Sequence, residues 1–189
     1  MLRGEAQLRL FQKVSRLTAK AAGLREALDT VVSLAADYLQ ADSCLLYLLA
    51  GSNELVLCAA RGANPSAVGK VRLRLDEGLT GWVARERRLV AISSEAQKDP
   101  RFKFFRDLPE DRYEAFLSAP LIARNRVVGV INLQHQRPHS HTGDELEMLT
   151  TLGEQVGGLV ALATVDTGHF AGLDLAEFVL GAATAAASK

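Results

Sequence analysis

Apolar side chains in the first forty residues recur at three- and four-residue spacing, the period of an amphipathic helix. The stripe of Leu10, Val14, Leu17 and Ala21 predicts a helix over about residues 5–22. Gly23 interrupts this pattern, and a second apolar stripe then predicts a helix to about residue 40 that should lie on a sheet. Its members are Leu24, Leu28, Val31, Val32, Ala35 and Leu39.

Continuous and alternating apolar runs then replace the helical period. The run CLLYLLA, the turn GSN and the run ELVLCAAR predict a hairpin, and KVRLRLDEG alternates like a half-exposed strand. GLTGWVARERR predicts a short helix and LVAIS another strand. A second hairpin is predicted by EAFLSAPLIA and VVGVINLQH, which flank the turn RNR.

A long helix should follow the last strand. Thr142 and Glu145 fit the capping box T-x-x-E at the start of HTGDELEMLTTLGEQVGGLVALA. One apolar stripe runs along this helix: Leu146, Leu149, Leu152, Val156, Leu159 and Ala163.

The last residues form an Ala-rich tail. Gly168 and Gly172 predict a break, and a weak stripe of Leu175, Phe178 and Val179 predicts a loosely held helix after it. We therefore divide the chain into an amino-terminal helix (1–22), a main domain with the long helix (23–165) and a tail or connector helix (166–189).

The element order indicates an α+β fold. Six strands with few crossovers predict a mainly antiparallel sheet with helices on its face. The irregular segment DPRFKFFRDLPEDRY joins two of these strands, and loops of that length in compact domains are usually functional lids or flexible links. We expect a ligand to enter there.

Composition narrows the class of protein. The 189 residues carry 22 basic and 22 acidic side chains, so neither a disordered chain nor a nucleic-acid binder is indicated. Cys44 and Cys58 lie in apolar runs, and we find neither a signal-peptide pattern nor an apolar stretch long enough for a membrane span. We expect a cytoplasmic protein that contacts no membrane. P-loop, zincin and nucleophile-elbow motifs are also missing, so we expect no catalytic residues, no cofactor and no enzyme activity.

Three histidines, His135, His139 and His141, crowd the last strand and the loop after it. Histidine is the commonest transition-metal ligand, but Pro138 lies between them and no acidic or cysteine ligand stands at a fixed spacing. From the sequence we therefore expect solvated histidines and no metal site.

Three stretches occur in order along the chain: LDEGLTGWVARERRLVAIS, DPRFKF and APLIARNRVVGVINLQHQRPHSHTGDELEMLTTLGEQVG. Together they resemble the GAF domain family, the regulatory fold of bacterial sensors, phytochromes and cyclic-nucleotide phosphodiesterases. The resemblance covers about residues 8–165. Within the family, the segment DPRFKFFRDLPEDRYEAFLSAPLI is most similar to the amino-terminal GAF domains of nitrogen-related phosphoenolpyruvate-protein phosphotransferases.

The resemblance implies a six-stranded antiparallel sheet with the terminal helices on one face. On the other face it implies a ligand cavity roofed by the segments around GLTGWVA and DPRFKFF, and we expect residues 99–113 to form the lid. The family's cavity positions fall on Trp82, Phe102, Phe105, Ser118, Ala119 and Asn132. Beside them, Arg101 offers a guanidinium that would suit a carboxylate or a phosphate.

Two functions remain open. The first is a sensor domain that binds a small metabolite and biases a homodimer or an attached output domain of a larger parent protein. In the second, the aromatic rings only fill the core, and the chain is a ligand-free structural module for dimerisation. For the dimer, Gly153, Gly157 and Gly158 would let another helix approach closely. Family members that reduce free methionine sulfoxide need reactive cysteines, a set that this chain lacks.

Overall fold

The structure is a computed structural model that describes residues 2–19, 23–62, 65–104 and 113–186. Its helices are α1 (Leu2–Ala19), α2 (Leu24–Tyr38), α3 (Gly78–Glu86), α4 (Gly143–Thr164), α5 (His169–Gly172) and α6 (Leu175–Ala186). Its strands are β1 (Ser43–Ala50), β2 (Glu54–Arg61), β3 (Arg72–Arg74), β4 (Val90–Ile92), β5 (Ala115–Ala123) and β6 (Arg126–His135).

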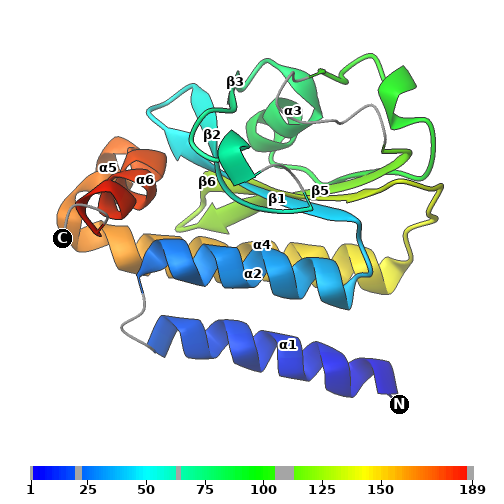
Figure 1. Cartoon of the computed structure of the whole chain (residues 1–189), viewed down its shortest axis with the longest axis horizontal. Coiled ribbons are helices and arrows are strands. Elements are labelled where there is room, and N and C mark those ends of the chain that lie inside the picture. Colours follow the sequence, from blue (N-terminus) through cyan, green and yellow to red (C-terminus); the bar gives the residue numbers. More distant parts are fainter. Residues whose placement is uncertain (1, 20–22, 63–64, 105–112, 187–189) are drawn as a thin grey trace.

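All neighbouring strands pair in an antiparallel sense, in the order β3-β2-β1-β6-β5-β4. At the centre, β1 pairs with β6 with Cys44 opposite Leu133. Figure 1 shows α2 and α4 side by side along one face of the sheet, α3 over the other face, and α1 as a further layer below α2 and α4. The six-stranded antiparallel sheet and the α+β class confirm the predicted fold.

The start of α4 follows from its capping box, as predicted. Thr142 Oγ1 accepts a hydrogen bond from the backbone N–H of Glu145, and Glu145 Oε2 accepts one from the backbone N–H of Thr142 at 2.7 Å. These two bonds satisfy N–H groups that a helix start would otherwise leave unpaired.

The glycines of α4 serve a different contact from the one predicted. A Cβ on Gly153 would lie 2.6 Å from the carbonyl oxygen of Pro120, and one on Gly157 would lie 2.3 Å from that of Ile122. Both glycines therefore admit β5, and not another helix, because α4 packs directly on this strand. The apolar stripe of α4 faces the sheet as well, since Leu149 and Val156 are fully buried.

The sequence predicted a loosely held tail, but in the structure α6 packs firmly against the domain. Leu175 and Val179 of α6 are buried, and Figure 1 shows α5 and α6 packed at the end of the sheet beside α2 and α4. The backbone N–H of Gly51 donates to the carbonyl oxygen of Leu173, which fixes the tail to the β1–β2 turn. The weak apolar stripe of α6 is therefore sufficient to hold this helix, because it packs against the sheet. Our division of the chain at residues 22 and 165 stays a prediction.

Among the described residues, no helix combines the length and the apolar character that crossing a membrane requires.

The close contact of α4 with β5 makes a matched pair of substitutions informative. Gly157→Ala forces a methyl group into the backbone of Ile122 and should lower the free energy of unfolding by about 1–3 kcal/mol. Gly158→Ala, one residue further, meets open space and should raise it by about 0.5–1 kcal/mol, because alanine favours the helix. Urea unfolding measures both variants, and equal effects would contradict this account of the packing.

Candidate functional site

A roof of α3 and residues 99–104 covers part of the face of the sheet opposite α2 and α4 (Figure 1). Gly81 lets α3 approach β3, because a Cβ there would lie 2.5 Å from the carbonyl oxygen of Arg74. Glu77, at the start of α3, accepts from the backbone N–H of Arg74 at 2.9 Å and forms an ion pair with Lys103 at 2.8 Å. These partners lower the pKa of Glu77 and connect the two parts of the roof.

Beneath the roof, three buried polar side chains form one hydrogen-bonded chain. Ser118 Oγ on β5 donates to Asn132 Oδ1 on β6 at 2.6 Å, and Asn132 Nδ2 donates to Thr80 Oγ1 on α3 at 2.8 Å. Ser118 and Asn132 are completely buried, and Thr80 is 6% exposed. We call Thr80, Asn132 and Ser118 the polar chain. It links the roof helix to the two adjacent strands through groups that would be costly to bury unpaired.

A small cavity lies beside the polar chain. Its volume is about 10 Å³, roughly the space that the centre of one water molecule requires. Its lining residues come from β3, from α3, from the segment 99–104 and from β5: Leu73, Gly78, Leu79, Thr80, Phe102, Lys103 and Phe116. In this arrangement the protein's own side chains occupy the space under the roof.

The predicted phenylalanines have different positions. Phe102 packs partly buried against the core and lines the cavity. Phe104 is 62% exposed and forms a T-shaped contact with the Phe102 ring at a centroid distance of 5.0 Å. Phe105 lies outside the described residues. One of the rings therefore forms part of the roof, while Phe104 projects outward.

Arg101 has partners within the protein. Its Nε and Nη2 bond to the two carboxylate oxygens of Asp99 at 2.9 and 2.7 Å. Its guanidinium also lies over the ring of Trp82, 4.6 Å from the centroid. The pKa of Asp99 is lowered because Arg101 bonds to its carboxylate, so the pair is fully ionised near neutral pH. An anionic ligand would compete with Asp99 for this guanidinium.

The structure brings Trp82, Arg101 and Phe102 together in the roof and places Ser118 and Asn132 below it. Ala119 is different: successive side chains of a strand point to opposite faces, so it lies on the face that α4 covers. Sequence reasoning missed Thr80 and Phe116. A usable signal for Thr80 was its place in the Gly-Leu-Thr-Gly sequence at the start of α3. This predicted helix had to lie close to the sheet that carries Asn132.

The two cysteines are unreactive in this arrangement. Cys44 and Cys58 are free thiols in strand interiors. Burial raises the pKa of both, that of Cys58 to about 12, so neither forms an appreciable amount of thiolate near neutral pH.

The histidines are placed differently from our expectation of solvated side chains. His135 is 7% exposed, and the rings of His139 and His141 lie near it at centroid distances of 4.1 and 5.7 Å. The expectation was wrong for His135, whereas His139 and His141 are half-buried. The loop after β6 folds back on the sheet, where the backbone N–H of His139 donates to the carbonyl oxygen of Ser93.

Comparison with known proteins places these observations in a family. The family model for the GAF domain matches residues 23–160. The GAF domain of an Acinetobacter phosphoenolpyruvate-protein phosphotransferase is 30% identical, with a TM-score of 0.77 over 89% of this chain and 98% of that one. That of the Coxiella burnetii enzyme is 28% identical, with a TM-score of 0.78 over 87% and 98%.

A curated relative adds a second protein class. The Nif-specific regulatory protein of Azospirillum lipoferum is 26% identical over 165 residues, which are 84% of this chain and 26% of the relative. This chain therefore spans about a quarter of the length of that relative.

The polar chain predicts a measurable cost. Ser118→Ala leaves Asn132 Oδ1 without its donor in a buried setting and should lower the free energy of unfolding by about 1–3 kcal/mol. Ser33→Ala is the control, because Ser33 Oγ bonds to the carbonyl oxygen of Asp29 on a partly exposed helix face. The control should change stability by less than about 0.5 kcal/mol in the same denaturant titration. Equal small effects of both variants would show that the polar chain has no energetic importance.

Proposed function

The chain belongs to the GAF domain family of regulatory sensor domains, and we propose that it senses a small polar metabolite bound between the roof and the sheet. The observation that carries this proposal is the polar chain. Ligand pockets are mostly apolar and contain a few well-placed polar groups that orient the ligand. Thr80, Asn132 and Ser118 are such groups within a largely apolar interior.

A further polar group lies on the same face of the sheet. Ser43 on β1 lies opposite Gln134, which is two residues beyond Asn132 on β6. The hydroxyl of Ser43 is buried without a hydrogen-bond partner among the described residues. A polar ligand that extended along β6 from Asn132 would supply one.

Binding requires the roof to move, because a cavity of about 10 Å³ admits no metabolite. The ion pair that joins α3 to residues 99–104 adds little to the cost of this movement. The Glu77–Lys103 ion pair is more than one-third exposed at both side chains, and exposed ion pairs contribute only about 0–1 kcal/mol. Arg101 bonds to Asp99 within the same segment, so that pair does not fasten the segment to the sheet.

Thr80 connects occupancy with a change in structure. A ligand that bonded to Asn132 in place of Thr80 would release α3 from β6. The movement of α3 and residues 99–104 would then be the signal that the domain transmits to an output domain of a longer parent protein. The Nif-specific regulatory protein of Azospirillum lipoferum supports such a parent, because the matched region is only 26% of its length.

One observation favours the alternative, a ligand-free structural module. Phe116 is 2% exposed and Leu73 is likewise buried, so the chain's own side chains already fill the space beneath α3. In that case the domain would only associate with a second copy, and no metabolite would change its stability.

A thermal-shift screen with amino acids, keto acids and nucleotides decides between the two. A ligand present at one hundred times its Kd should add about 2.7 kcal/mol of stability, which corresponds to a rise in Tm of about 5–10 °C. Phe102→Ala should weaken binding of the compound found, measured by calorimetric titration, because Phe102 lines the cavity. Phe104→Ala is the matched control and should retain affinity, because that ring is 62% exposed. Unchanged affinity in folded Phe102→Ala, or no shift with any compound, would contradict the proposed site.

We also propose a homodimer formed through the terminal helices. Leu8 on α1 and Leu162 on α4 are large apolar side chains with exposures of 57% and 61%. Leu8→Glu and Leu162→Glu should therefore convert the dimer to folded monomers in sedimentation experiments. Leu149→Glu should unfold the chain instead, because Leu149 is fully buried against the sheet. Wild-type protein that sediments as a monomer, or surface variants that remain dimeric, would contradict this interface.

A further inference from the structure

His135, His139 and His141 lie together where β6 ends and the loop to α4 begins. One ring nitrogen from each residue can be chosen so that the three atoms all lie within 4.8 Å of one another. His135 is on the face of β6 opposite Asn132, since the two positions differ by an odd number of residues in a regular strand segment. This histidine cluster is therefore separate from the polar chain.

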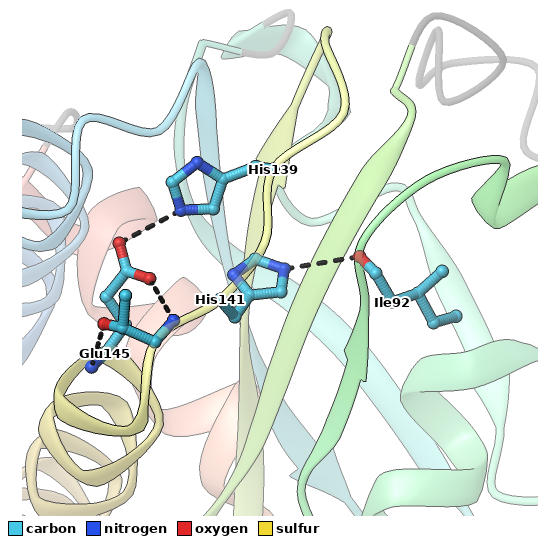
Figure 2. Close-up of polar contacts among 5 residues, drawn as sticks. Ile92, His139, His141 and Glu145 are labelled. Atoms are coloured by element: carbon cyan, nitrogen blue, oxygen red, sulfur yellow. Dashed lines mark hydrogen bonds and ion pairs between the residues drawn. The ribbon is translucent and has the colours of Figure 1, made fainter.

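Two of the rings are held by hydrogen bonds through Nε2. Figure 2 shows His139 Nε2 directed at Glu145 Oε1, at 3.0 Å, and His141 Nε2 directed at the backbone carbonyl oxygen of Ile92, at 3.3 Å. A carboxylate and a carbonyl only accept, so both Nε2 atoms carry the proton and both Nδ1 atoms carry the lone pair of the neutral ring. Metal-ligating histidines are held in this way, with the second ring nitrogen donating to a carboxylate or a carbonyl.

The electrostatic setting favours the neutral form of His135 and His141. Burial, reinforced by the neighbouring His139 and His141, lowers the pKa of His135 to about 4. Burial and then His139 lower the pKa of His141. Protonated rings would repel one another at these distances, whereas the carboxylates of Asp42 and Glu145 place negative charge nearby. A cation shared by neutral imidazoles fits this environment.

We propose that His135, His139 and His141 bind one transition-metal ion of the Zn²⁺ class. Imidazole nitrogen suits Zn²⁺, Co²⁺, Ni²⁺ and Cu²⁺, whereas Mg²⁺ and Ca²⁺ prefer oxygen ligands. Three histidines and one open position are a familiar coordination set of Zn²⁺. Solvent reaches the cluster through a hollow of about 360 Å³ that His135 and His139 line together with Asp42, so water can occupy the fourth position.

Binding requires one ring to turn. The rings of His135 and His139 are stacked with an interplanar angle of 10°, and lone pairs in parallel planes do not converge on one ion. His139 is the ring that turns, because it lies on the loop with a side-chain exposure of 33%, whereas His135 is buried in the strand. Zn–N distances of about 2.0–2.1 Å then set how closely the three ligating nitrogens must approach one another.

The ion would join elements that are distant in sequence. His135 belongs to β6, and the bonds of His141 to Ile92 and of His139 to Glu145 lead to β4 and to the first turn of α4. Occupancy would therefore fasten the start of α4 to the sheet.

Calorimetric titration of tag-free protein with Zn²⁺ near neutral pH tests the proposal. We expect one ion per chain, and His139→Ala and His141→Ala should each weaken binding by about 100-fold or more. His169→Ala is the matched control, because His169 in α5 is the remaining histidine of the chain and should not contribute. Glu145→Gln should weaken binding by about 10- to 100-fold through the orientation of His139. Absence of binding, or full affinity in His139→Ala and His141→Ala, would overturn the proposal.

A spectroscopic measurement on the wild-type chain keeps the test decisive if a variant fails to fold. Co²⁺ should give the visible absorption of a tetrahedral nitrogen site, and Zn²⁺ should shift the imidazole NMR signals of His135, His139 and His141. The spectra should show ligation of His139 and His141 through Nδ1, with Nε2–H retained. Signals that shift only for His169, or for none of the histidines, would overturn the assignment.

Discussion

The central strands of the sheet are buried on both faces, and the rest of the structure follows from this constraint. β1 is buried at every position from Ser43 to Leu49, and β6 from Val128 to His135. Side chains alternate between the faces, so each face needs its own cover. On one face α2 and α4 supply a continuous helical layer, and α4 lies close enough to require Gly153 and Gly157. On the other face the cover is a short helix and an irregular segment, and there the polar chain and the small cavity occur.

The parts of the fold that were predictable are those for which the sequence carries a local signal. Helical and alternating periods locate elements well because burial imposes them on the sequence, and the capping box of α4 is a local signal between Thr142 and Glu145. The identity of the element that packs against a helix or strand is not encoded in the local sequence. Gly153 and Gly157 signalled a close approach correctly, but only the tertiary arrangement shows that β5 is the element that approaches. The weak stripe on α6 similarly revealed nothing about the β1–β2 hairpin that buries it.

The candidate site was predictable in part, for the same reason. Asn132 stood out as a polar residue in an apolar strand, and its need for partners was foreseeable. Thr80 was not identified as the partner because the bond joins α3 to β6 across a long sequence separation. Ala119 shows the limit of carrying positions over from a family, since the alternation of β5 places its side chain on the other face of the sheet. His135, His139 and His141 have no metal-binding spacing, and only the fold-back of the loop brings their rings together.

The strand order has a consequence for how the chain reaches this structure. The hairpins β1–β2 and β5–β6 pair residues close in sequence, so each can form early and independently. The contact between β1 and β6 is different, because Cys44 cannot meet Leu133 until most of the chain has been synthesised and a long loop has closed. We expect this pairing to be the slow step of folding. Until then, apolar β1 has an open edge, and the nascent chain is most exposed to aggregation on the ribosome during that interval.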